Sequence, residues 1–206
     1  MAEMDLQRRT LRLYGELLAR ESSWAGKLVV TAGEGCSATG LCAAVAIAGG
    51  TCLAIDPDAK AVRSIFREGG VDFVVNTLDE ALRVLKNEVR QGRPLGVALT
   101  ADVEAVLVEF RERGVLAELA VEAASFPAKA YASLPVEGSE ELSVWLAARG
   151  WQEALVPRDA GWVFAEDDPR WRWVRGIARY QRSASRESRA VWLSEAELSN
   201  LSRALE

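Results

Sequence analysis

The sequence predicts an α/β protein with a doubly wound, mostly parallel Rossmann-like sheet that carries helices on both faces. From residue 27 onward, short β-rich runs alternate with helical patterns of about 10 to 15 residues, the alternation expected of strands and crossover helices. Residues 51–55 form a continuous apolar run, which suits a central strand buried on both faces. A glycine-containing turn at 31–40 joins the first strand to an almost wholly apolar helix.

The first strand is expected at 27–31, and the apolar helix after the turn extends to residue 48. Residues 51–55 then form the second strand. A helix over 58–68 ends at Gly69 and Gly70, because glycine readily adopts the left-handed conformation that closes a helix.

The second part of the sheet begins with a strand at 73–75. Thr77 and Glu80 follow it with the spacing of a capping box, in which each side chain would bond to a free amide of the other residue. After that helix, the sequence predicts in order a strand, a helix and a strand, at 95–99, 102–113 and 116–121. Strands connected by helices in this order imply right-handed crossovers.

The pattern loosens after Ala124. Residues 125–138 contain two prolines and no clear period, and a short helix is expected at 140–149. Ser194 and Glu197 form a second capping box, which opens a final helix extending to residue 205. Tryptophans gather in this last third, and we expect them to pack a C-terminal layer onto the sheet: Trp145, Trp151, Trp162, Trp171, Trp173 and Trp192.

We expect two parts in the chain, an N-terminal helix at 1–24 that packs on the core and a single Rossmann domain at 25–206. The helix, from about residue 5 to residue 20, carries one apolar stripe: Leu6, Leu13, Tyr14, Leu17 and Leu18. Such a stripe normally docks on the core of its own domain. A homodimer contact is the alternative use.

Composition narrows the classes of function. The chain has 206 residues and a formal charge of −5, which argues against a nucleic-acid partner, because binding to the phosphate backbone needs clustered Lys and Arg. It contains no histidine, which excludes histidine-based catalytic triads and His-ligated zinc. Its three cysteines have neither a CxxC spacing nor an even number, so we expect no metal site and no disulfide framework.

We expect a cytoplasmic protein without a membrane segment. The N-terminus has acidic residues where a signal peptide would be basic, and no apolar region follows it. Glycines divide the apolar stretch at 41–55, which is also shorter than the roughly 20 residues needed to cross a bilayer.

The turn after the first strand has the composition of a phosphate-binding turn. Gly33 and Gly35 would let a pyrophosphate approach the amides at the start of the following helix. Gly40 lies two positions later than the third glycine of the dinucleotide fingerprint. Glu34 would repel a phosphate if its carboxylate faced the ligand.

Asp56 ends the second strand about 20 residues after the turn, where an acidic side chain accepts hydrogen bonds from the ribose of NAD. The alternative is a structural role as the N-cap of the helix after Pro57.

These residues resemble the NAD-binding core of urocanase (urocanate hydratase). The similar segments lie along most of the chain: 25–33 (AGKLVVTAG), 44–56, 77–81 (TLDEA), 92–95 (GRPL), 101–104 (ADVE), 113–115 (RGV) and 134–135. Residues 164–175 resemble the segment before the last core strand of that family, and 189–193 (RAVWL) resemble that strand itself.

The resemblance implies a Rossmann-like core that binds NAD⁺. In urocanases the nicotinamide ring acts as an electrophile toward the imidazole of urocanate, which is hydrated to imidazolonepropionate. The family's polar stretch near the cofactor corresponds here to 121–128, where Glu122 and Ser125 remain comparable. The candidate cofactor-binding residues are therefore Gly33, Gly35, Cys36, Ser37, Asp56, Glu122 and Ser125.

The departures from the family predict a loss of activity. The catalytic cysteine loop of urocanases should fall at 150–164, which holds no cysteine, so we assign no catalytic residue. The urocanase chain is also more than twice as long. We expect a binding or interaction module without hydratase activity, with a site for NAD, another dinucleotide or another small anion that is weakened or lost.

The alternative function is a small NAD- or nucleotide-dependent enzyme that reuses the same pocket. Cys36 would be its nucleophile, because a helix N-terminus lowers the pKa of a thiol. Cysteine at such a position is otherwise a small buried apolar residue.

A basic cluster marks the C-terminal part: Arg170, Arg172, Arg175, Arg179, Arg182, Arg186 and Arg189. The spacing from Arg172 to Arg182 predicts one face of a helix. We expect a solvated face paired with the acidic residues at 166–168, and an anionic ligand is the alternative.

Overall fold

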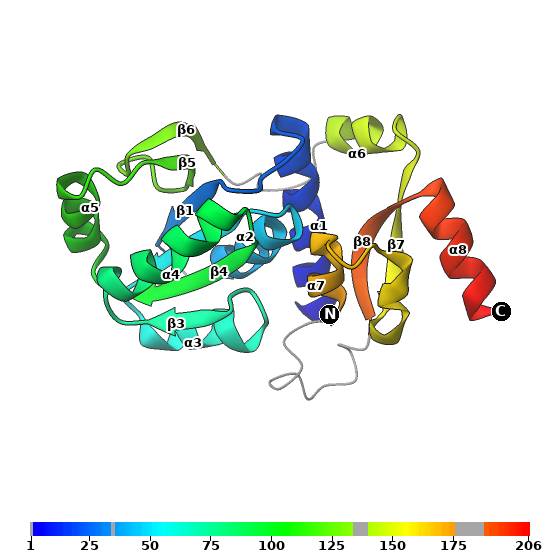
Figure 1. The fold of residues 1–206 in the computed structure, drawn as a ribbon, viewed down its shortest axis with the longest axis horizontal. Coiled ribbons are helices and arrows are strands. Elements are labelled where there is room, and N and C mark those ends of the chain that lie inside the picture. The colour runs from blue at the N-terminus through cyan, green and yellow to red at the C-terminus, as the bar shows by residue number, and fades with distance from the viewer. Residues whose placement is uncertain (1, 34–35, 134–139, 176–187) are drawn as a thin grey trace.

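The computed structural model describes residues 2–33, 36–133, 140–175 and 188–206, and its core is a six-stranded parallel sheet (Figure 1). The strands lie in the order β3-β4-β2-β1-β5-β6, and every neighbouring pair is parallel. Their bounds are β1 Leu28–Ala32, β2 Thr51–Asp56, β3 Phe73–Val75, β4 Leu95–Thr100, β5 Ala117–Val121 and β6 Ala128–Ala132.

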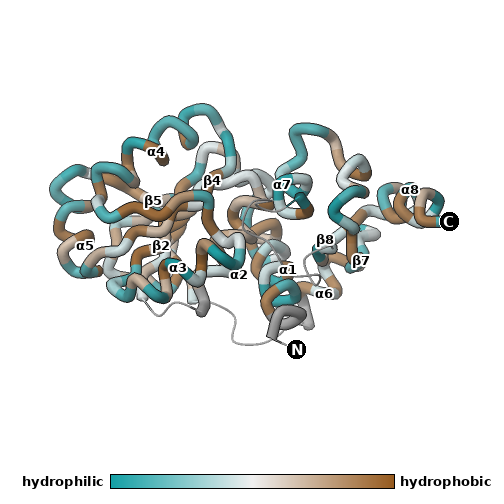
Figure 2. Tube along the Cα trace, turned by 90° about the horizontal axis from the view of Figure 1, so that it is seen from below, coloured by the Kyte–Doolittle hydropathy of each residue, from teal (hydrophilic) through white to brown (hydrophobic). Residues whose placement is uncertain are grey.

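Helices cover both faces of this sheet. Along β2, Cys52 and Ala54 pack toward α2 (Cys36–Ile47) and α3 (Ala59–Arg67). Leu53 and Ile55 point to the opposite face and pack toward α4 (Leu78–Gln91) and α5 (Val103–Glu112). Strands such as β2 and β5 are mostly hydrophobic, whereas the outer turns of α4 are hydrophilic (Figure 2). The predicted fold class, a doubly wound Rossmann-like α/β sheet, is therefore confirmed.

Strand β6 lies in the segment for which the sequence showed no period. Only residues 122–127 connect β5 to β6, far fewer than the dozen or more usual between parallel strands. The chain must therefore reverse at once after β5, and Glu122 does so with a φ of 52°. Because no crossover helix covers this pair, α1 (Ala2–Arg20) lies there instead, with Leu13 and Leu17 lining a small pocket beside the two strands.

A second unit of structure follows the sheet. It comprises α6 Glu140–Ala147, β7 Trp151–Pro157, the 3-10 helix η1 Arg158–Val163, α7 Pro169–Arg175, β8 Ser188–Ser194 and α8 Glu195–Leu205. Strands β7 and β8 pair antiparallel in a separate two-stranded sheet. The expectation that residues 189–193 form the last strand of the core is therefore wrong, because β8 pairs with β7 and with no strand of the six-stranded sheet.

Helix α1 stands between the two parts of the molecule (Figure 1). On one side it packs against α2, where Leu13 lies next to Gly40. On the other side Gly15 leaves room for Leu146 of α6. The buried Gln7 side chain accepts a hydrogen bond from the backbone N–H of Ala190 at 2.9 Å, which ties α1 to β8.

The two expected capping boxes differ in detail. Ser194 and Glu197 form the complete reciprocal pair at the start of α8. Thr77 accepts from the Glu80 amide at 3.3 Å, but the Glu80 carboxylate bonds to the N–H of Asn76. The helix start is correctly placed, and the return bond lies one residue earlier than the motif implies.

The basic cluster is not one solvated face. Arg170 and Arg189 are buried, with 8% and 2% of their surface exposed. Arg189 stacks over the Trp173 ring, 4.3 Å from its centroid, and Arg170 pairs with Asp168. Helix α7 ends at Arg175, and Arg179, Arg182 and Arg186 lie outside the described residues.

The C-terminal tryptophans do not form a uniform layer. Trp173 is buried, Trp162 is 55% exposed, and the other four are partly buried. Trp151 contacts the Tyr14 ring of α1 rather than the sheet, with the ring centroids 6.5 Å apart. Among the described residues, no helix has the length and hydrophobicity to span a membrane.

Candidate functional site

The carboxyl edge of the central strands brings three of the predicted site residues together. Ala32 of β1 lies opposite Ile55 of β2, so Gly33 and Asp56 are neighbours one step further along. Thr31 lies opposite Val121 of β5, so Glu122 follows at the same edge. The chain leads from β1 to β2 on one side of β1, whereas β5 lies on the other side of β1. The strand order therefore changes direction between β1 and β5, which makes this a topological switch point. Ligands of doubly wound sheets bind in the crevice outside such a point.

Gly33 has the conformation that a close backbone approach requires. Its φ is 97°, in the left-handed region that disfavours residues with a Cβ. Its N–H donates to the carbonyl of Ile55 at 3.0 Å, which fixes the turn against β2. A Cβ built at Gly33 would meet no atom within 4 Å, so the turn faces open space. Helix α2 begins three residues later, at Cys36.

Asp56 is 6% exposed, and it shapes the turn that follows β2. Its Oδ1 accepts a hydrogen bond from the Asp58 amide at 2.7 Å. The N-cap of α3 is Asp58, whose Oδ1 accepts from the Lys60 amide. The alternative role of Asp56 as that cap is therefore wrong, because the cap lies two residues later. Among the described residues, Oδ2 of Asp56 has no hydrogen-bond donor, which leaves one oxygen available to a ligand.

Glu122 is exposed, with the unusual backbone conformation already described. Its N–H donates to the Ala132 carbonyl at 3.0 Å, so its backbone is held between β5 and the end of β6. Left-handed conformations of residues other than glycine cost free energy and gather at functional sites. Here the short reversal into 122–127 accounts for the conformation without a ligand.

Ser125 is separated from this group. Its carbonyl accepts from Arg111 in the last turn of α5 at 3.0 Å. Two residues later, the Pro127 carbonyl accepts from Ala117, the first residue of β5. Ser125 therefore lies on the return toward the amino end of β5. Gly35 lies outside the described residues, and the side chains of Cys36 and Ser37 are not described, so their predicted roles stay predictions.

Sequence reasoning did not single out two further carboxylates at the same edge. Asp58 caps α3, and Asp102 caps α5 by accepting from the Ala105 amide at 2.9 Å. Both follow a buried strand by two residues, which is the signal that could have identified them. Together with Asp56 and Glu122 they make the edge acidic.

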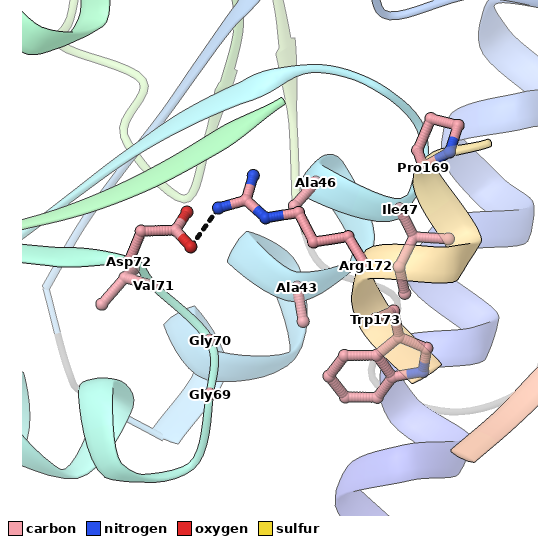
Figure 3. Close-up of a pocket in the computed structure, with 10 residues that line it drawn as sticks. All are labelled: Ala43, Ala46, Ile47, Gly69, Gly70, Val71, Asp72, Pro169, Arg172 and Trp173. Carbon is pink, nitrogen blue, oxygen red and sulfur yellow. Dashed lines mark ion pairs between the residues drawn. The ribbon is translucent and has the colours of Figure 1, made fainter. Parts of the chain in front are cut away.

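A pocket of about 80 Å³ lies at the opposite, amino edge of the sheet (Figure 3). It is lined by the last turns of α2, the loop 69–72 before β3, and α7. Arg172 reaches across it from α7 and forms an ion pair with Asp72. Arg172 also donates to the Pro94 carbonyl, and Asp72 bonds to both backbone groups of Gly96 at 2.8 Å.

These contacts join α7 to the start of β3 and β4. Because both charged groups of the pocket already serve protein partners, we assign it a structural role. It is also remote from the switch point, since it borders the first residues of the strands rather than the last.

Two buried cysteines lie under α2. Sγ of Cys42 and Sγ of Cys52 are 3.3 Å apart, and both residues are completely buried free thiols. The contact with Cys42 and the burial raise the pKa of the Cys52 thiol well above its ordinary value, so it is unreactive at neutral pH. Within the described part of the chain, no cluster of three or more Cys, Asp or Glu residues could hold a metal ion.

Residues 9–148 match the family model of the urocanase Rossmann-like domain. The chain belongs to the urocanase family. The match begins in α1 and ends just after α6, so it includes the whole six-stranded sheet and the switch point. The elements from β7 to α8 lie beyond it, which agrees with their separate sheet.

The switch point fits part of the cofactor associated with this family, NAD. The Oδ2 of Asp56, which has no donor in the described part of the chain, suits a ribose hydroxyl, and the open turn at Gly33 suits the close approach of a nucleotide to the backbone. The acidic residues around them do not favour a pyrophosphate. The fit therefore concerns the nucleoside half more than the phosphates.

Proposed function

We propose that this member of the urocanase family is a nucleotide-binding module that lacks urocanate hydratase activity. The ligand lies at the switch point between β1 and β5. NAD⁺ is the reference ligand, because the Rossmann-like domain of the family is associated with it. Binding is weak, with a dissociation constant in the micromolar range or above, because few groups at the crevice favour a phosphate.

The turn at Gly33 is the observation that carries the binding proposal. It combines a φ of 97° with open space where a side chain would be, at the end of the central strand and before an apolar helix. A glycine held in this conformation at a solvent-facing turn suits a ligand that contacts the backbone.

The positions of the cysteines support the absence of hydratase activity. The three cysteines are Cys36, Cys42 and Cys52, and the last two are buried in the core. None lies at 150–164, where the family resemblance places the reactive cysteine; that segment forms β7, the 3-10 helix and their connections. The chain also has no histidine to act as a general base.

Titration with NADH, followed through the fluorescence of the ligand, tests the binding. Gly33→Ala should weaken binding about tenfold, or about 1.4 kcal/mol, because the new methyl group occupies the approach to the turn. Gly114→Ala is the matched control, since Gly114 also has a positive φ, 61°, and open space but lies between α5 and β5. Equal affinities of the two variants, or no binding of either NADH or adenosine at millimolar concentration, would refute the site.

Urocanate turnover is tested separately. The full chain, supplied with excess NAD⁺, should leave the ultraviolet absorbance of urocanate unchanged over hours. Turnover that rises in proportion to protein concentration, or NAD⁺ binding with a submicromolar dissociation constant, would overturn the proposed loss of activity.

A nucleotide-dependent enzyme that uses Cys36 is the second candidate. The observation in its favour is that α2 begins at Cys36, where helix amides lower a thiol pKa. Iodoacetamide should then label Cys36 faster than a model thiol at pH 7, while the buried Cys42 and Cys52 stay unlabelled in the native protein. Peptide mass spectrometry measures all three rates, and an ordinary rate at Cys36 removes this candidate.

A further inference from the structure

The carboxyl edge of the sheet carries negative charge and no cation at its strand ends. Within two residues after each of the six strands there is no Lys or Arg. The same positions include Asp58, Asp102 and Glu122, and Asp56 ends β2 itself. The first basic residue after β2 is Lys60, in the first turn of α3.

Two helix ends at this edge, the N-termini of α3 and α5, already carry the carboxylate of a capping residue. Oδ1 of Asp58 accepts from the Lys60 amide at 2.8 Å, and Oδ1 of Asp102 accepts from the Ala105 amide at 2.9 Å. Each carboxylate places its negative charge on the positive end of the helix dipole. The N-termini of α3 and α5 therefore contribute little attraction to a second anion.

An uncharged ligand meets none of these obstacles. The turn at Gly33 is open to a close approach, and Asp56 is nine-tenths buried with Oδ2 free of donors from the described residues. A carboxylate in this position accepts hydrogen bonds from sugar hydroxyls. Hydroxyl donors are favoured by the same charges that repel a phosphate.

We propose that the crevice selects an uncharged nucleoside over the corresponding phosphates, including NAD⁺. The proposal rests on the proposed function, whose site it shares. The nucleoside supplies the favourable contacts, and each added phosphate weakens binding because the acidic edge repels it.

Ligand-observed NMR titrations with adenosine, AMP, ADP and NAD⁺ test the order of affinity. In 20 mM salt, adenosine should bind at least threefold more tightly than AMP, and AMP more tightly than ADP. Salt screens repulsion, so 500 mM NaCl should strengthen the binding of AMP and NAD⁺ and leave adenosine unchanged. An ordinary phosphate site shows the opposite salt dependence.

The double variant Asp58→Asn and Asp102→Asn isolates the charge. Asparagine is as good an N-cap as aspartate, so both helices keep their caps while two negative charges are removed. Affinity for AMP and NAD⁺ at low salt should rise about threefold, as expected for charges about 10 Å from the phosphates in water. Adenosine affinity should not change.

The matched control is the double variant Glu153→Gln and Glu166→Gln. It removes the same net charge from exposed residues in β7 and in the loop before α7. Its affinities should equal those of the unmodified chain.

The outcomes separate the two proposals. If NAD⁺ or AMP binds more tightly than adenosine, or if salt weakens their binding, the nucleoside preference is overturned and the nucleotide site stands. If no member of the series binds, or if Gly33→Ala changes none of the affinities, the proposed function itself fails.

Discussion

Gly161, in the 3-10 helix after β7, leaves no room for a methyl group. A Cβ built there would coincide with the Trp171 ring of α7. The glycine therefore lets an aromatic side chain lie directly on the backbone, and this contact packs η1 against α7. No local sequence pattern predicts this contact, because the close approach depends on a partner ten residues away.

Gly161→Ala should destabilise the protein by about 3 kcal/mol, at the upper end of overpacking costs, because Trp171 must leave its position. The free energy of unfolding from urea titration measures the effect. Gly40→Ala provides the contrast, because the nearest atom to its Cβ is 3.5 Å away. Alanine there should leave stability unchanged or raise it by up to about 1 kcal/mol, since Gly40 lies in a helix. Equal effects at the two sites would contradict the packing argument.

At the level of single residues, the sequence identified Asp56 but not how it is used. Because Asp56 ends a buried strand, the sequence predicts that its side chain lies at the carboxyl edge of the sheet, and the structure places it there. Which of Asp56 and Asp58 caps α3 depends on the path of the loop through Pro57, and two aspartates so close together offer both solutions. Glu122 was identified by resemblance to the family. The reversal of its backbone results from the six-residue connection between β5 and β6, which no local sequence pattern predicts.

Arg170 of α7 joins several elements of the C-terminal unit. Its guanidinium donates to Asp168 at 2.7 Å, to the Trp192 carbonyl of β8 at 2.9 Å and to Glu197 of α8. Burial opposes the charge of Arg170, but the hydrogen bonds to Asp168 and Glu197 outweigh it and raise its pKa. Burial alone would raise the pKa of Glu197, yet the bonds from Arg170 and Ser194 hold it below its ordinary value.

This arrangement predicts acid sensitivity in the docking of α8. A carboxyl group whose pKa is lower in the folded state stabilises the fold above its unfolded pKa, and the stabilisation disappears as the pH falls through the folded pKa. Glu197→Gln should lower the free energy of unfolding at pH 7 by about 1.5 kcal/mol, a modest value because solvent reaches part of the side chain.

Urea titrations at pH 7, 4 and 3 measure this dependence. The difference between the variant and the unmodified chain should shrink as the pH falls below 4.5, the ordinary pKa of a glutamate, because Glu197 becomes protonated. Glu195→Gln, an exposed change in the same turn of α8, should have little effect at any pH. A difference that stays constant with pH would show that the charge is not responsible.

For whole elements, periodicity predicted the helices and strands up to β5 closely, because nearly all of them bury a face of apolar residues. The exception is β3, in which Phe73 and Val74 are exposed. Periodicity failed at β6, where only the end residues Ala128 and Ala132 are partly buried and the three residues between them are exposed. Alanine has weak preference for strands, and the prolines nearby suggested a loop. The partner of β8 was also missed, since pairing in a separate sheet leaves no local signature.

At the scale of the whole molecule, α1 packs against both parts of the structure. Leu11, Leu13, Tyr14 and Leu17 are each at most 5% exposed, although they lie on more than one side of the helix. A surface helix would expose one of these sides. The two parts of the molecule are therefore joined through α1, together with the contacts that α7 makes with α2 and with the start of β3 and β4.

A fragment limited to residues 1–148, which contains the entire family match, should not fold stably alone. Without β7, β8 and α8, the buried side of α1 that faces them becomes exposed apolar surface. We expect increased binding of a hydrophobic dye, self-association on size-exclusion chromatography and loss of a cooperative thermal transition. A monomeric fragment with a cooperative transition near that of the full chain would refute this dependence.

The early position of α1 in the chain affects how synthesis must proceed. Gln7 meets its partner in Ala190 across 183 positions of sequence. During translation, α1 therefore leaves the ribosome long before β8 is made. The apolar side of α1 that packs against β8 stays in contact with solvent, and with other proteins, until the residues near 190 have been added.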